Sequence, residues 1–142
     1  MLIGLIYTVV LTNSNFLTKY QADQMPAYNL FLEYLSEESA LTKKNIAWFI
    51  GNDTQYIGSF SESEWHVQQI KTGFLPIIKF TTKFQDDLGN VFSISDKRDD
   101  PFLVFYPSGQ SSGGKITFDE AGNNYILKID QYSSVKILAQ KL

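Results

Sequence analysis

The spacing of the apolar residues changes at Asn45, and this change does most to limit the possible folds. Before Asn45, apolar residues recur every three or four positions, as they do along one face of a helix. The residues that define this face are Tyr28, Phe31, Leu32 and Leu35. After Asn45, apolar and polar residues alternate in short runs, which is typical of half-buried strands. A helical region followed by many strands predicts an α+β domain.

The strand-like runs follow one another at spacings of roughly ten residues, which is typical of sandwich-like domains. We predict about eight short strands among nine candidate runs of residues. They lie within residues 46–50, 55–60, 65–70, 77–84, 91–94, 102–106, 115–118, 125–129 and 135–138. Residues 51–53, 86–90 and 119–123 are predicted turns, because Gly, Asn and Asp favour turn conformations. The expected architecture is a long N-terminal helix packed on an antiparallel β-sandwich-like domain.

This pattern divides the chain into an N-terminal helical segment, residues 1–44, and a strand-rich globular domain, residues 45–142. Pro26 lies within the helical pattern. Because proline lacks a backbone N–H and clashes with the preceding turn, Pro26 is expected to kink one long helix or to separate two.

The chain begins with a run of mainly apolar residues, from Leu2 to Leu11. The run is too short to cross a bilayer, which takes about 20 residues, and it lacks the basic region of a signal peptide. It is either a buried element of the core or the C-terminal half of a membrane helix that begins before Met1. The polar residues 13–15, followed by spaced apolar residues, favour the second interpretation because they resemble a helix leaving a membrane.

The composition excludes several classes of function. The net charge is -3, without a block of basic residues, so nucleic acid is not an expected partner. The chain has no cysteine, which excludes disulfides and thiolate sites. His66 is the only histidine, and its neighbours offer no catalytic or metal-binding partner. Gly114-Lys115 leads into a strand, whereas a phosphate-binding loop leads into a helix. We therefore expect no catalytic residues and no cofactor.

Clusters of acidic residues raise the question of a metal site. Asp86, Asp87, Asn90 and Asp96 offer oxygen ligands, and calcium prefers about six to eight of them. None of these residues fits an EF-hand pattern, and each is also typical of an ordinary polar turn. No metal is expected, and these residues are the candidates should one bind.

The C-terminal third resembles a known family. Residues 105–110 (FYPSGQ), 113–118 (GGKITF) and 125–130 (YILKID) resemble the end of H-type minor pseudopilins of bacterial type II secretion and related minor type IV pilins. Residues 35–48 resemble the end of that family's helix, and Trp65 falls where the family often has tryptophan. One departure is that the chain lacks the glycine-led prepilin peptidase motif, since Met1 falls inside the corresponding helix.

The resemblance implies a non-enzymatic subunit of the tip or initiation complex of a secretion pseudopilus. Its helix would lie in the bacterial inner membrane, with a methylated N-terminus and the domain in the periplasm. The implied partners are other pseudopilin or pilin subunits and a secreted cargo. The helix would contact its neighbours through Leu2, Ile3, Leu5, Ile6, Val9, Val10, Phe16 and Leu17. The alternatives are a minor type IV pilin and a periplasmic β-sandwich module that binds a glycan or lipid.

A second candidate interface is the Ser- and Gly-rich loop at residues 107–114. Without a large apolar side chain, it is expected to be mobile and to make few burial contacts. It either connects two strands or contacts a neighbouring subunit through Gln110, Ser111 and Ser112. In both cases Ser111→Ala and Ser112→Ala are expected to cost less than about 0.5 kcal/mol.

Overall fold

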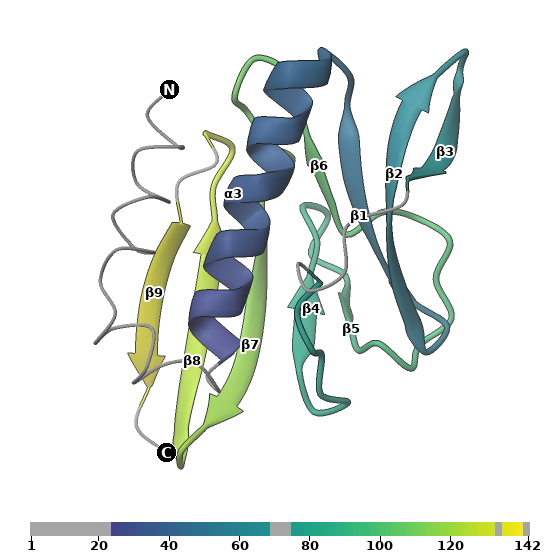
Figure 1. Ribbon diagram of the computed structural model, residues 1–142. Helices are drawn as coiled ribbons and strands as arrows, with labels where there is room; N and C mark the ends of the chain where they lie inside the picture. Colours follow the sequence, from purple (N-terminus) through teal and green to yellow (C-terminus); the bar gives the residue numbers. More distant parts are fainter. Residues whose placement is uncertain (1–23, 69–74, 133–134, 141–142) are drawn as a thin grey trace.

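The computed structural model describes residues 24–68, 75–132 and 135–140 (Figure 1). Within them, one helix, α3 (Gln24–Thr42), precedes all the strands. The strands are β1 (Ile46–Gly51), β2 (Thr54–Ser61), β3 (Glu64–Gln68), β4 (Lys83–Gln85), β5 (Val91–Phe92), β6 (Leu103–Phe105), β7 (Gly114–Glu120), β8 (Asn123–Ile129) and β9 (Val135–Gln140). The α+β class is confirmed. The part of the predicted helix before Gln24 lies outside the described residues, so the kink or break expected at Pro26, in the first turn of α3, stays a prediction.

The strands form two antiparallel sheets. Sheet A has the order β3-β2-β1-β6, and sheet B has the order β5-β4-β7-β8-β9. Local turn chemistry explains the hairpins: Asn52 and Asp53 both have positive φ between β1 and β2, as do Ala121 and Gly122 between β7 and β8. Two-residue turns of this kind match the twist of the strands that they join.

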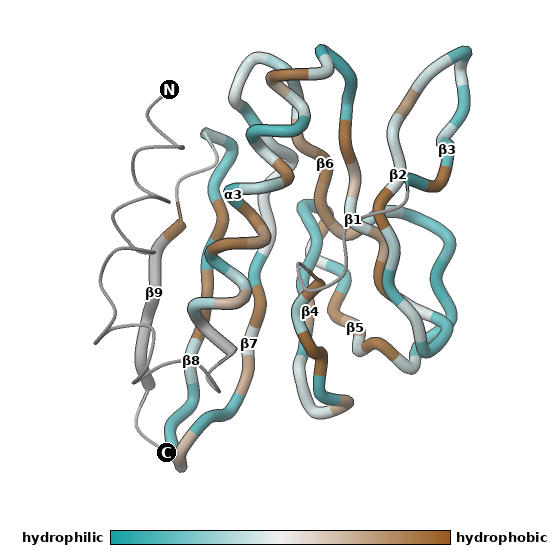
Figure 2. Tube along the Cα trace, viewed as in Figure 1, coloured by the Kyte–Doolittle hydropathy of each residue, from teal (hydrophilic) through white to brown (hydrophobic). Residues whose placement is uncertain are grey.

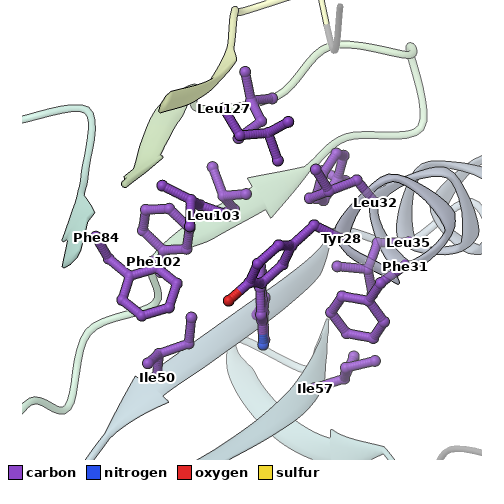
Figure 3. Close-up of a cluster of buried hydrophobic side chains, with 14 of the residues drawn as sticks. Tyr28, Phe31, Leu32, Leu35, Ile50, Ile57, Phe84, Phe102, Leu103 and Leu127 are labelled. Carbon is purple, nitrogen blue, oxygen red and sulfur yellow. The ribbon is translucent and has the colours of Figure 1, made fainter. Parts of the chain in front are cut away.

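Helix α3 and both sheets share one core (Figure 3). Trp48 is central to it through its ring contacts. Its ring lies 4.9 Å from that of Phe31 on α3 and 5.7 Å from that of Phe102, measured between centroids. Tyr28 reaches sheet B, with its ring 5.4 Å from that of Phe118 on β7. The predicted helix face is confirmed as the buried one, since Tyr28, Phe31, Leu32 and Leu35 are at most 2% exposed. Each such side chain stabilises the fold by about 1.5–3 kcal/mol.

The C-terminal end of α3 is fixed to sheet A by Ser39. Its buried hydroxyl lies 2.6 Å from the carbonyl oxygen of Lys44 and 3.0 Å from that of Phe105 on β6. The N–H of Lys43 donates to the Ser39 carbonyl oxygen, and Lys43 itself has a φ of 58°, which ends the helix. The direction of α3 relative to sheet A is therefore set by hydrogen bonds as well as by packing.

One predicted strand is largely wrong. Residues 77–84 alternate apolar and polar side chains, but only β4, which begins at Lys83, is a strand in this region. The N–H of Thr82 donates to the Lys79 carbonyl oxygen, and this turn interrupts the extended backbone that a strand would need. Phe80 is 77% exposed while Thr82 and Phe84 are buried, so these residues do not share one face. The predicted strand at 91–94 is also shorter, because Asp96 folds back onto Ser93 through two hydrogen bonds.

Candidate functional site

The predicted assembly face, from Leu2 to Leu17, lies outside the described residues. Its role therefore stays a prediction. Within the described residues, no helix is both long and apolar enough to cross a membrane.

The loop at residues 107–114 has an exposed tip and an anchored base. At the tip, the N–H of Tyr106 donates to the Gln110 carbonyl oxygen, and the N–H of Gly109 donates to the Tyr106 carbonyl oxygen. Residues 107–110 are exposed between these bonds. Gln110 is therefore accessible to a neighbouring molecule, and its role as a contact stays a prediction.

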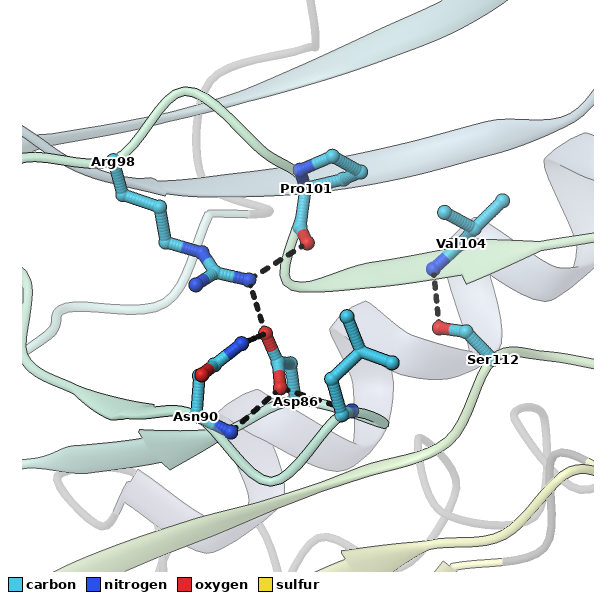
Figure 4. A network of polar contacts seen from close by, with 7 residues as sticks. Asp86, Asn90, Arg98, Pro101, Val104 and Ser112 are labelled. Atoms are coloured by element: carbon cyan, nitrogen blue, oxygen red, sulfur yellow. Dashed lines mark hydrogen bonds and ion pairs between the residues drawn. The ribbon is translucent and has the colours of Figure 1, made fainter.

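The base of the loop corrects the expectation that it makes few burial contacts. Ser111 is 4% exposed, and its hydroxyl donates to the Asp130 carbonyl oxygen at 2.9 Å and accepts from the N–H of Gly113 at 3.2 Å. Ser112 pairs with Val104 on β6, through its N–H at 2.9 Å and its hydroxyl at 3.0 Å (Figure 4). The small side chains let this segment lie close to the edge of β6, where it connects the two sheets.

Asp86 is the hub of a buried polar network (Figure 4). Its carboxylate accepts from the Arg98 guanidinium at 2.5 Å and from the backbone N–H groups of Leu88 and Asn90 at 3.0 and 2.9 Å. The guanidinium also lies 4.0 Å from the ring centroid of Phe92. Burial alone would raise the pKa of Asp86, but hydrogen bonds from Arg98 and Asn90, with the charge of Arg98, hold it below its ordinary value. The network ties the β4–β5 hairpin to the segment before β6.

The structure places Asn90 against Asp86 through hydrogen bonds, but it does not gather the metal-ligand candidates into one site. Asp86 already faces the positive charge of Arg98, and Asp96 accepts from the N–H of Ser93 at 2.8 Å. Asp87 and Asn90 have exposed positions on the turn. Among the described residues, no group of three or more carboxylate, histidine or cysteine side chains is arranged to hold a metal ion. Asp86 thus takes part in an ion pair and Asp96 in a turn.

His66 likewise has no catalytic arrangement around it in the described part of the chain. Its Nε2 atom lies 3.1 Å from the Ser61 carbonyl oxygen and 3.6 Å from an oxygen of Glu64. These contacts stay within the β2–β3 hairpin, so a local structural role explains them.

Sequence reasoning missed an aromatic cluster on the face of sheet A that points away from α3. The cluster consists of Phe49, Tyr56, Phe60 and Trp65. The Phe49 ring stacks on Tyr56, with centroids 4.7 Å apart, and Trp65 lies 5.6 Å from Phe49 and 5.1 Å from Phe60. Gly58 leaves room for it, because a Cβ there would lie 3.0 Å from the Phe49 ring. One sequence signal could have revealed the cluster. Because β1 is apolar at every position, side chains on both faces of this strand need to be buried.

Comparison with known proteins bears on the fold. No family model and no curated protein matches the sequence. Two solved structures of the minor pseudopilin EpsH from the type 2 secretion system of Vibrio cholerae are similar to the chain. They share 15% and 14% sequence identity with it, each with a TM-score of 0.57. The matches cover 80% and 81% of this chain and 93% and 94% of those structures. The resemblance seen in the sequence is thus confirmed at the level of the fold, which is that of the minor pseudopilin EpsH.

Proposed function

We propose that the chain is a non-enzymatic minor pseudopilin that belongs to the tip or initiation complex of a type II secretion pseudopilus. The observation that supports this most is the architecture. The chain aligns with EpsH over about four-fifths of its own length, and over nearly the whole length of the EpsH structures. The sequence resemblance in the C-terminal third points to the same family independently of the coordinates.

In this role the protein works mechanically. The apolar face from Leu2 to Leu17 packs against the helices of neighbouring subunits in the inner membrane, and the domain lies in the periplasm. Because α3 is held by the shared core and by Ser39, a movement of the helix is transmitted to both sheets. The position of the helix in an assembly therefore fixes which surfaces of the domain face other subunits or a secreted cargo.

A strain that lacks the gene provides the main test. We expect deletion to reduce type II secretion, and the full-length gene to restore it. Val9→Lys, which places a charge on the proposed assembly face, should fail to restore secretion at an unchanged protein level. Ser14→Lys is the matched control from the same segment, because its position is already polar, and it should restore secretion.

Two results would count against this proposal. Normal secretion in the deletion strain would remove the secretion role, and loss of surface pili in the same strain would favour the alternative of a minor type IV pilin. Both readouts are therefore taken from the same cultures.

The loop tip is tested separately in the complemented strain. Because Ser111 is buried, a useful substitution must spare it, so Gln110→Arg is preferred. If the tip contacts another subunit, secretion should fall while the purified variant unfolds like the parent. Normal secretion with Gln110→Arg would leave the loop as a connector.

A further inference from the structure

The edge of sheet A at β3 has unpaired backbone in the described structure. β3 lies at the rim of the sheet (Figure 1), where β2 is its only partner among the described strands. The sheet edge at β6 is different, because Ser111 bridges to Phe105 there. β3 therefore presents a row of backbone donors and acceptors that another strand could use.

The hairpin geometry identifies which backbone groups these are. Glu62 and Ser63 have φ of 53° and 66°, so they form a two-residue turn, and Ser61 and Glu64 flank it as a hydrogen-bonded pair. Antiparallel pairs alternate between hydrogen-bonded and non-hydrogen-bonded. The N–H and C=O groups of Trp65 and Val67 consequently point away from β2, toward the free edge.

The same two residues also supply apolar side chains. Trp65 pairs with Phe60 and Val67 pairs with Gly58, which puts their side chains on the face of the aromatic cluster. Val67 is 71% exposed and Phe60 is 39% exposed. An added strand would therefore find hydrogen bonds along the edge and an apolar strip on one face.

The charge beside this strip is negative. Glu62 and Glu64 are exposed next to Trp65, and in the described residues neither has a lysine or arginine within ion-pair distance. The ring of His66 lies beside Glu64, with its Nε2 atom 3.6 Å from a carboxylate oxygen of Glu64. A basic side chain near the end of an added strand would complement these carboxylates.

We propose that β3 is a docking edge for an extended segment of another protein, which adds as a further strand to sheet A. The segment carries apolar side chains at alternate positions, facing Phe60, Trp65 and Val67, and a lysine or arginine facing Glu62 and Glu64. Backbone pairing gives affinity in this mode, and the alternating side chains give specificity. The inference goes beyond the proposed assembly role and does not depend on it, since binding is measured with the isolated protein.

The probe is the peptide acetyl-Lys-Val-Thr-Val-Thr-Val-Lys-amide, titrated into the full chain while tryptophan emission is recorded. Trp48 is fully buried, so Trp65 is the tryptophan positioned to respond. We expect saturable binding that weakens at least tenfold when glutamates replace both lysines of the peptide. N-methylation of every peptide amide should also weaken binding at least tenfold, because it removes the backbone donors.

Substitutions in the protein locate the site. Val67→Lys should weaken binding at least tenfold, whereas Val91→Lys on β5, an exposed valine on another sheet edge, should change it less than twofold. Glu62→Lys combined with Glu64→Lys should reverse the preference between the two peptides. The proposal is overturned if the basic peptide leaves the emission unchanged at millimolar concentration, or if Val67→Lys and Val91→Lys bind it equally. Secretion is not part of this readout, so failure here leaves the proposed function untouched.

Discussion

Tyr28 shows how a single buried side chain can limit stability at high pH. It is 0% exposed, and burial raises the pKa of its phenol to about 12, against a smaller lowering by the neighbouring Thr82 hydroxyl. Neither hydroxyl has a well-aligned hydrogen bond. The aromatic ring thus accounts for the stabilising contribution of Tyr28, while the oxygen contributes little.

We therefore predict that Tyr28→Phe leaves the free energy of unfolding at pH 7 unchanged, or raises it by up to about 1 kcal/mol. A raised pKa in the folded state means that the unfolded chain loses its proton first. Stability is thus fully present below the ordinary tyrosine pKa of 10.0 and is lost as the pH rises toward about 12. Urea unfolding at pH 7 and at alkaline pH should show a smaller loss for Tyr28→Phe than for the parent. An equal loss in both proteins would contradict this assignment.

Ser111 yields a prediction opposite to the one that its sequence context suggests. Removing its hydroxyl leaves the N–H of Gly113 without that acceptor and the Asp130 carbonyl oxygen without that donor. Ser111→Ala should therefore cost about 1–3 kcal/mol of folding stability. Ser108→Ala, at the exposed tip of the same loop, should cost less than about 0.5 kcal/mol. Chemical denaturation of the two variants side by side measures the difference, and equal costs would show that the anchoring bonds contribute little.

The contrast between Tyr28 and Ser111 explains what the sequence could predict at this scale. The burial of Tyr28 follows from apolar spacing along the chain, which is a local signal. Ser111 is buried because residues 130 and 131, which are distant in the sequence, lie against it and accept its hydrogen bonds. No local sequence pattern indicates that contact. Small polar residues in a loop carry too little information to separate an anchor from an exposed tip.

At the scale of elements, strands joined by short turns were predicted well. For β1, β2, β7 and β8, apolar content and neighbouring turn residues agree, and both are local. Residues 77–82 show the limit of this local signal. Their apolar and polar side chains alternate as in a strand, but a strand also needs a partner strand, and the described structure gives this segment none. The aromatic cluster on sheet A was missed for a related reason. It joins three strands, and only the register places their rings on one face.

The Asp86–Arg98 ion pair links two elements, and we expect it to be costly to break. The carboxylate is 3% exposed and the guanidinium side chain 13% exposed, so removing one partner leaves the other charge poorly solvated. Asp86→Ala should destabilise the domain by about 3–5 kcal/mol at pH 7. Asp87→Ala, on the exposed neighbour, is the control and should cost less than about 0.5 kcal/mol. Replacing the pair with Asp86→Leu and Arg98→Met together should cost less than Asp86→Ala alone.

The same ion pair predicts a dependence on acid. Because the folded-state pKa of Asp86 is held below its ordinary value, the unfolded chain takes up a proton first as the pH falls. The stabilisation is present above the ordinary aspartate pKa, near pH 4, and is lost as the pH falls through the folded-state value. The difference in stability between the parent and Asp86→Ala should therefore shrink below about pH 4. A difference that stays constant down to pH 2 would show that the charge of Asp86 is not the cause.

For the whole molecule, the main question is where the independently folding unit begins. The sequence pattern predicts a boundary between residues 44 and 45. However, α3 contributes Tyr28, Phe31, Leu32 and Leu35 to the core shared by both sheets. At about 1.5–3 kcal/mol for each side chain, their loss would remove most or all of the roughly 5–15 kcal/mol that stabilises a typical domain.

We therefore predict that a chain of residues 24–142 folds on its own, whereas a chain of residues 45–142 does not. The longer chain keeps every residue of the described core, and the shorter one exposes Trp48 and the core side of both sheets. Urea unfolding followed by tryptophan emission and circular dichroism should give one cooperative transition for residues 24–142. Residues 45–142 should show none, or one at much lower urea. Phe31→Ala in the longer chain should cost about 3–5 kcal/mol, and Leu41→Ala, at an exposed position of the same helix, should cost little. A cooperative transition of equal stability in both chains would mean that the sheets fold without α3, and would place the boundary at residue 45 after all.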